Sequence, residues 1–196
     1  MSTPFSTLAC ELTSGVLPSA GAITGTVARF GQDLTNALVL TLTADLSVLS
    51  VPQFVVIPAG QAVVTFDLDA VDDNIANGTQ AVTISAMATG FVSGNEILNV
   101  TDNDVASVSA TPIAGTLTSE SGASTIIHLV LTSEPRSTVT IPIESSDVSE
   151  GTVSLSSVSF TTSNWNQPRS ITVTGVDDDA VDGNVTYRVD VGHAIS

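Results

Sequence analysis

Apolar and polar residues alternate along much of the chain, which is the pattern of half-buried β-strands. Residues 64–70 and 82–86 each place every second side chain on one apolar face, and residues 171–173 and 187–191 repeat this pattern further along. A period of two residues puts alternate side chains on opposite faces of a sheet. Stretches rich in Gly, Pro and Asn separate these short segments, and no window keeps a helical period. The pattern therefore predicts an all-β chain.

The pattern occurs twice, which predicts two domains. Residues 71–78, VDDNIANG, align without a gap with residues 176–183, VDDDAVDG, and an alternating strand stands before and after each segment. The repeat predicts two tandem immunoglobulin-like antiparallel sandwiches, over 1–104 and 105–196, with residues 1–9 as an N-terminal extension. The first copy ends with the strand-forming string EILNVTDND, whereas the second stops before an equivalent string. The second sandwich is therefore expected to lack its last strand.

Composition agrees with an all-β chain and argues against several classes of function. The chain has 20 acidic residues against four basic ones, all arginine, for a net charge of −16, and aromatic residues make up 4% of it. Such a charge repels phosphate backbones and anionic lipid, so nucleic acid and membrane insertion are not expected. Cys10 is the only cysteine, which excludes an intrachain disulfide. The opening residues also lack the basic-then-apolar order of a secretory signal.

The acidic residues gather at corresponding places in the two copies. Asp45 follows LVLTLTA and Asp147 follows IPIESS, while Glu11 precedes Thr-Ser-Gly and Glu120 precedes Ser-Gly. Eight further acids lie in the two aligned loops or in the closing Asp-Asn-Asp of the first copy: Asp72, Asp73, Asp102, Asp104, Asp177, Asp178, Asp179 and Asp182. In a sandwich of this layout, we expect these loops to converge at one pole. Calcium takes six to eight oxygen ligands, which clustered aspartates can supply.

The same residues allow other interpretations. Aspartate favours turns by itself, so the clusters could be solvated turns. Neither loop follows the order of an EF-hand, and magnesium prefers fewer protein carboxylates. No Gly-x-Ser-x-Gly motif frames a nucleophile, and the single tryptophan offers little to a sugar-binding groove. The chain is therefore expected not to be an enzyme.

The layout resembles the Calx-beta repeat, as do the strings ITVTGVDDDAVDGNVTYRV and VPQFVVIPAGQAVVTFDLDAVDDNIANGTQAVTI. The resemblance runs over nearly the whole chain from about Glu11. It implies Ca²⁺ ligands in both copies. In the first these are Glu11, Asp45, Asp72, Asp73, Asn77, Asp102 and Asp104, and in the second Glu120, Asp147, Asp177, Asp178 and Asp182, with Asp179 as an extra. The second copy lacks the closing Asp-x-Asp, which leaves its site open.

These features lead to one main expectation about function and two alternatives. The main one is a calcium-binding structural or adhesive module of an extracellular or cell-surface protein of bacterial type, with calcium rigidifying the domain poles and the joint between domains. Its expected partners are neighbouring repeats, identical subunits, or an extracellular protein or glycan. The first alternative is a filament subunit that donates residues 1–9 as a strand to the next subunit. The second is a glycan- or protein-binding adhesin.

Overall fold

A computed structural model describes residues 6–12, 15–18, 21–31, 33–112, 116–179, 181 and 183–195, and all regular elements in these ranges are β-strands. The predicted all-β class is confirmed. The chain divides into two compact units, the first made of Met1–Asp73 and Asn77–Asn103 and the second of Asn74–Ala76 and Asp104–Ser196. Within the described part of the chain, no helix is long and apolar enough to cross a membrane.

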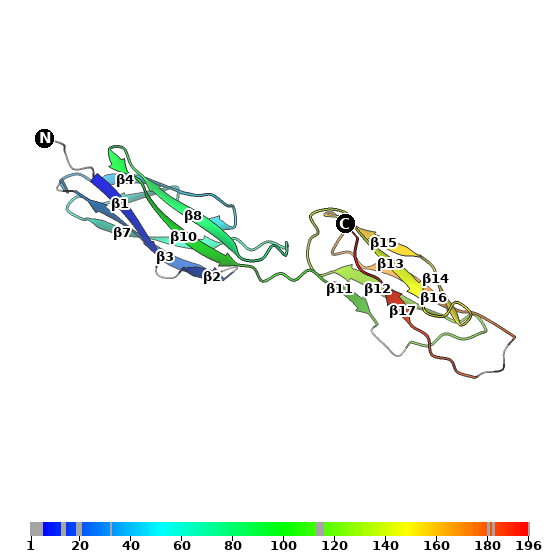
Figure 1. Ribbon diagram of the computed structural model, residues 1–196. Coiled ribbons are helices and arrows are strands. Elements are labelled where there is room, and N and C mark those ends of the chain that lie inside the picture. The colour runs from blue at the N-terminus through cyan, green and yellow to red at the C-terminus, as the bar shows by residue number, and fades with distance from the viewer. Residues whose placement is uncertain are drawn as a thin grey trace. The chain divides into compact units, whose positions relative to one another are not determined.

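The first unit is a sandwich of two five-stranded sheets (Figure 1). One sheet has the order β5-β7-β3-β1-β9, with β5 at Leu49–Ser50, β7 at Val63–Ala70, β3 at Ala22–Phe30, β1 at Ser6–Leu12 and β9 at Phe91–Val92. The other has the order β2-β10-β8-β4-β6, with β2 at Val16–Pro18, β10 at Gly94–Thr101, β8 at Gln80–Met87, β4 at Leu38–Ala44 and β6 at Phe54–Ile57.

The alternating residues of these strands form the core of the first unit. On β7, Phe66 and Leu68 are buried while Asp67 and Asp69 are exposed, so the predicted face is confirmed. Val82, Ile84 and Ala86 on β8 are fully buried against them, together with Val27 and Leu98 from the two sheets. Aliphatic side chains from both inner faces thus fill the space between the sheets, as in other β-sandwiches.

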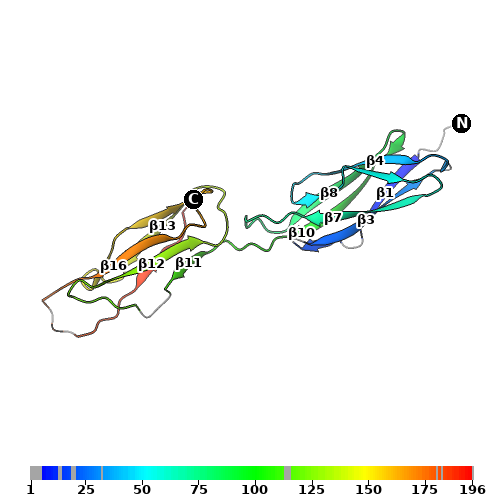
Figure 2. The ribbon, with the colours of Figure 1, turned by 180° about the vertical axis from the view of Figure 1, so that it is seen from behind.

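The second unit has a four-stranded and a three-stranded sheet, seen from the other side in Figure 2. The larger has the order β11-β12-β16-β14, with β11 at Val108–Thr111, β12 at Ser124–Leu131, β16 at Arg169–Gly175 and β14 at Gly151–Val153. The smaller has the order β15-β13-β17, with β15 at Ser157–Phe160, β13 at Val139–Ser145 and β17 at Val189–Val191. Leu129, Ile141, Phe160 and Ile171 form its core, against which Trp165 packs.

Strand register relates the two units and shows which strand the second one lacks. Leu42 and Ala44 of β4 pair with Ala86 and Ile84 of β8, and Ile143 and Ser145 of β13 pair with Val191 and Val189 of β17 in the same way. β17 is therefore the counterpart of β8. On its other side β8 pairs with β10, whereas β17 pairs only with β13 among the described residues. Among the described residues, the second unit thus shows no counterpart of β10.

The N-terminal strand of the first unit begins earlier than the sequence pattern suggested. Residues 6–9 belong to β1, which pairs with β3 from Thr7 onward, and Leu8 is buried. Residues 6–9 are therefore part of the first sandwich rather than of an extension. The rest of the proposed extension, residues 1–5, lies outside the described residues.

Arg29 near the end of β3 is the only basic residue in residues 1–104, and it is 5% exposed. Its guanidinium donates to backbone carbonyls on two loops: Nε to Gln61 at 3.0 Å, Nη1 to Asn36 at 2.8 Å, and Nη2 to Gln61 at 2.7 Å and to Leu34 and Pro58 at 3.3 Å. These bonds give a buried cation the partners that it needs. Arg29 therefore ties together two loops at its end of the sandwich.

Cys10 on β1 is buried in the core of the first unit. Burial, with the nearby charges of Glu96 and Glu11, raises the pKa of its thiol to about 11 from 9.0. At about pH 8 this lowers the thiolate fraction roughly 100-fold. We expect iodoacetamide to alkylate the native protein at least that much more slowly than the protein unfolded in guanidinium. Equal rates in the two states, followed by mass spectrometry, would show that Cys10 is accessible.

Candidate metal centre

A small cavity lies at the end of the first unit where β7 leads into the loop before β8. Its polar lining comes from Asp73, Asn77, Gly78 and Gln80 of that loop and from Asp102 directly after β10, and Val48, Val71 and Val100 supply its apolar wall. The cavity measures about 20 Å³, which is room for one particle of the size of a water molecule or a metal ion. Two aspartates and two residues with side-chain amides therefore line an open space of ionic size.

Asp102 fixes the shape of this loop through the backbone. Its Oδ2 accepts hydrogen bonds from the backbone N–H groups of Asn77 at 2.6 Å and Gly78 at 2.8 Å. Gly78 has a φ of +71°, a conformation that favours glycine. The Nε2 atom of Gln80 donates to the carbonyl of Asn77 at 2.9 Å. The loop is thus already ordered around the cavity by its own contacts.

The structure brings some of the expected ligands of the first unit together and leaves others apart. Asp73, Asn77 and Asp102 line the cavity. Asp72 is exposed and does not line it. Asp45 is placed at the end of β4 by its own contacts, because its Oδ1 accepts from the backbone N–H of Thr83 at 2.7 Å. Asp104 belongs to the second compact unit, so it is not counted with the cavity.

Glu11 lies away from this end of the sandwich. Glu11 pairs with Thr26 of β3. Thr26 lies four residues from Ala22, the first residue of β3, and Ala22 pairs with Asp69 shortly before the cavity loop. Four residues of an extended strand span about 13 Å. Glu11 is also exposed while its neighbour Cys10 is buried, so it faces outward from the sheet. The expectation that Glu11 shares the pole with the aspartates is wrong for this structure.

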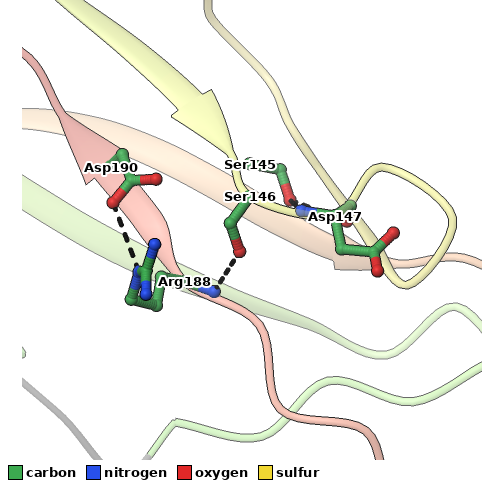
Figure 3. A network of polar contacts seen from close by, with 5 residues as sticks. All are labelled: Ser145, Ser146, Asp147, Arg188 and Asp190. Carbon is green, nitrogen blue, oxygen red and sulfur yellow. Dashed lines mark hydrogen bonds and ion pairs between the residues drawn. The ribbon is translucent and has the colours of Figure 1, made fainter.

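The counterpart of Asp45 in the second unit is Ser146 rather than Asp147. In the first unit the backbone N–H of Asp45 donates to the carbonyl of Thr83 at 3.2 Å. At the same place in the second unit, the backbone N–H of Ser146 donates to the carbonyl of Arg188 at 2.9 Å, and Ser146 Oγ accepts from the backbone N–H of Arg188 at 2.8 Å (Figure 3). Ser146 is identified by the register of β13 on β17. The sequence alone does not show this register.

Asp147 instead belongs to a turn of its own. Its side chain points away from Arg188 and Asp190 in Figure 3, and its Oδ1 accepts from the Ser149 hydroxyl and from the Ser149 backbone N–H at 3.1 Å. These bonds hold the pKa of Asp147 below its usual 3.8, the hydroxyl bond contributing most. Arg188 and Asp190 form an exposed ion pair at 3.5 Å, which adds little stability.

The other acids expected in the second unit do not form a cluster in the described residues. Glu120 lies in a turn closed by the bridge between Ser119 and Ala123. It is not the counterpart of Glu11, because the register of β11 on β12 puts Thr111 in that position. Asp177 and Asp179 are exposed and Asp178 is half-buried. Asp182 lies outside the described residues.

Nowhere in the described ranges do three or more His, Cys, Asp or Glu side chains gather closely enough to hold a metal ion by themselves. The lining of the cavity in the first unit includes two residues with carboxylates, Asp73 and Asp102, and two with side-chain amides, Asn77 and Gln80. Calcium accepts carboxylate, amide and backbone oxygens together with water. This donor set fits one partly hydrated calcium ion, and it lacks the nitrogen or sulfur ligands that zinc prefers.

The charges of the first unit are arranged in favour of a cation at this end. Residues 1–104 contain ten acidic residues and one arginine. Arg29 lies seven residues along β3 from Ala22, about 24 Å from the cavity end. A cation at the cavity is therefore separated from that positive charge by well over a Debye length at physiological salt.

No protein-family model and no curated protein matches the chain. Similar solved structures include CBD12 from CALX1.2, at 14% identity with a TM-score of 0.44, covering 94% of this chain and 80% of that one. The calcium binding domain CBD12 of CALX1.1 has 14% identity and a TM-score of 0.43 over the same shares. A protein of unknown function from Porphyromonas gingivalis W83 has 8% identity and a TM-score of 0.34, covering 88% of this chain and 84% of that one. All three TM-scores are below 0.5.

Proposed function

We propose that the first unit binds one calcium ion in the cavity between the loop after β7 and the end of β10, and that the chain is a structural or adhesive module. The observation that carries this proposal is the convergence of Asp73, Asn77, Gln80 and Asp102 on a space of about 20 Å³. Asp73 comes from one side of the loop and Asp102 from another strand. An ion held by both would join two segments that are 29 residues apart in the sequence.

Calcium would stabilise this end of the sandwich by removing a repulsion. Two carboxylates about 4 Å apart repel each other by roughly 1–4 kcal/mol, depending on the local dielectric constant. A divalent cation bound by both Asp73 and Asp102 would offset the repulsion between their negative charges. Because Asp102 also holds the backbone of Asn77 and Gly78, the ion and the hydrogen bonds would support the same loop geometry.

The small number of carboxylates suggests weak binding. Extracellular calcium modules work with dissociation constants of about 10⁻⁴–10⁻³ M, which match millimolar calcium outside cells. We therefore propose an extracellular or cell-surface location, where such a site would be filled. The abundance of acidic residues, with a net charge of −16, suits a soluble surface that does not associate with nucleic acid or anionic lipid.

Thermal unfolding in calcium and in chelator tests the proposal. Calcium at about ten times the dissociation constant stabilises the folded state by roughly 1.4 kcal/mol, and a domain of this size should then melt roughly 5–10 °C higher. Asp73→Asn should abolish the shift. Asp67→Asn, which removes the same charge from an exposed position on β7, should keep it. Identical melting curves in calcium and chelator would rule the site out.

A filament built by strand donation is the second candidate, and the observation that favours it is that β17 ends its sheet in the described part of the chain. The donor proposed from the sequence, residues 1–9, is less suitable, because residues 6–9 already pair within β1. Deleting residues 1–5 would leave β1 intact and would test the remaining part of that donor. If electron microscopy showed unchanged assembly after this deletion, residues 1–5 would be excluded as a donor strand.

A further inference from the structure

Asn77 and Gly78, in the loop between β7 and β8, form the only Asn-Gly pair in the chain. The amide carbon of an asparagine side chain can be attacked by the backbone nitrogen of the next residue, and glycine hinders that attack least because it has no side chain. Gly78 is exposed, and a Cβ atom built on it would meet no atom within 4 Å. Residues 77–79 lie outside the strands. The pair is therefore sterically open to this reaction.

The hydrogen bonds of the loop oppose the attack. Asp102 Oδ2 accepts from the backbone N–H of Gly78 at 2.8 Å and from that of Asn77 at 2.6 Å. The nitrogen of Gly78 becomes a nucleophile only when its proton leaves, and a hydrogen bond to a carboxylate retains that proton. Gln80 Nε2 donates to the side-chain oxygen of Asn77 at 3.4 Å and to its carbonyl at 2.9 Å. The reaction therefore requires this loop to open first.

Conversion of Asn77 would change the charge of the cavity. Its side chain is neutral, and the residue lines the cavity together with Asp73 and Asp102. Loss of the amide nitrogen leaves a carboxylate at position 77, either on the side chain or, in the isoaspartate form, on the former backbone carbonyl. In both forms the cavity gains one negative charge. Calcium sites bind more tightly as the number of charged ligands rises.

We propose that Asn77 is a deamidation site that Asp102 keeps unreactive while the loop is closed. When the loop opens, the nitrogen of Gly78 loses its proton and bonds to the side-chain amide carbon of Asn77. The side-chain amide nitrogen takes up a proton and leaves as ammonia. One water molecule then opens the resulting cyclic imide to aspartate or isoaspartate. The modification does not depend on calcium, whereas its effect on calcium affinity rests on the proposed function.

Peptide mass spectrometry of the full chain, incubated in chelator at mildly alkaline pH, tests the site. In guanidinium, Asn77 should deamidate before Asn99, which is followed by valine. In the folded chain, Asn77 should react at least about tenfold more slowly than in guanidinium, because hydrogen bonds to a charged group must break first. Equal rates in the two states would overturn the proposal, as would an unmodified Asn77 in guanidinium.

Asp102→Ala tests the protecting role. This variant should raise the rate of deamidation in the folded chain at least about tenfold. Arg29→Met is the matched control, because it removes hydrogen bonds at the opposite end of the same sandwich and leaves those of Asp102 in place. It should react like the unchanged chain, with circular dichroism showing that both variants are folded. If Asp102→Ala had no effect, or Arg29→Met raised the rate equally, Asp102 would not be the protecting group.

Asn77→Asp reproduces the direct product and tests the effect on the cavity. We expect it to bind calcium at least about tenfold more tightly than the unchanged chain in isothermal titration, because a third carboxylate joins the site. Equal affinity would refute this effect. Since the deamidation rates are measured in chelator, they stand or fall separately from calcium binding by the unchanged chain.

Discussion

Replacing Arg29 with methionine is expected to destabilise the first unit by about 3 kcal/mol, the cost of leaving buried polar partners unsatisfied. Methionine keeps much of the side-chain volume but offers no donor to the carbonyls of Leu34, Asn36, Pro58 and Gln61. Both loops at that end of the sandwich would lose their common support. Chemical unfolding, followed by circular dichroism, measures the loss.

Arg136→Met provides the control for this change. Arg136 is exposed, so the substitution removes the same charge from the chain with an expected effect below about 0.5 kcal/mol. Since the chain is strongly acidic, any general effect of losing a positive charge would appear in both variants. If the two variants unfold at the same denaturant concentration, the hydrogen bonds of Arg29 contribute no net stability.

Replacing Asp102 with alanine is expected to destabilise the first unit by about 2 kcal/mol even in the presence of chelator. The carboxylate accepts two backbone hydrogen bonds, from Asn77 and Gly78, and such charge-assisted bonds are among the stronger ones in proteins. The loop is partly exposed, so water recovers some of the loss. The same substitution should also remove calcium stabilisation, because it deletes one of the two cavity carboxylates.

Asp67→Ala is the matched control for Asp102→Ala, since Asp67 is an exposed aspartate on β7. Unfolding in chelator separates the loop contacts of Asp102 from any role in metal binding. A variant that loses stability only when calcium is present would show that the backbone hydrogen bonds are unimportant and that Asp102 acts solely as a ligand.

The fold could be predicted because its main determinants are local. Alternation on residues 64–70 and 82–86 has a period that only a strand satisfies, and these residues form the core of the first unit. The repeat of the acidic loop predicts that the strand after it, β17, corresponds to β8. The start of β1 at Ser6 was not visible in the same way, because residues 6–9 contain a single strongly apolar residue, Leu8.

The candidate site could be predicted only in part, because it depends on register. Asp73, Asn77 and Asp102 follow strands that end at one pole, so their convergence follows from the topology. The expectations for Glu11 and Asp147 rest on neighbouring residues in the sequence, which do not specify strand register. A shift of one residue decides whether Asp147 or Ser146 meets Arg188, and no pattern in the sequence fixes that shift. The structural role of Arg29 could not be predicted, because its hydrogen-bond partners are four backbone carbonyls rather than a charged side chain.

Isothermal titration of the chain with calcium measures binding at the proposed site. We expect one weak site with a dissociation constant of about 10⁻⁴–10⁻³ M, lost in Asp73→Asn and retained in Asp67→Asn. Titration with magnesium should give a weaker response, since that ion requires a tighter and more regular set of ligands. Absence of calcium binding to the unchanged chain, or equal binding by both variants, would show that the cavity of the first unit is not a calcium site.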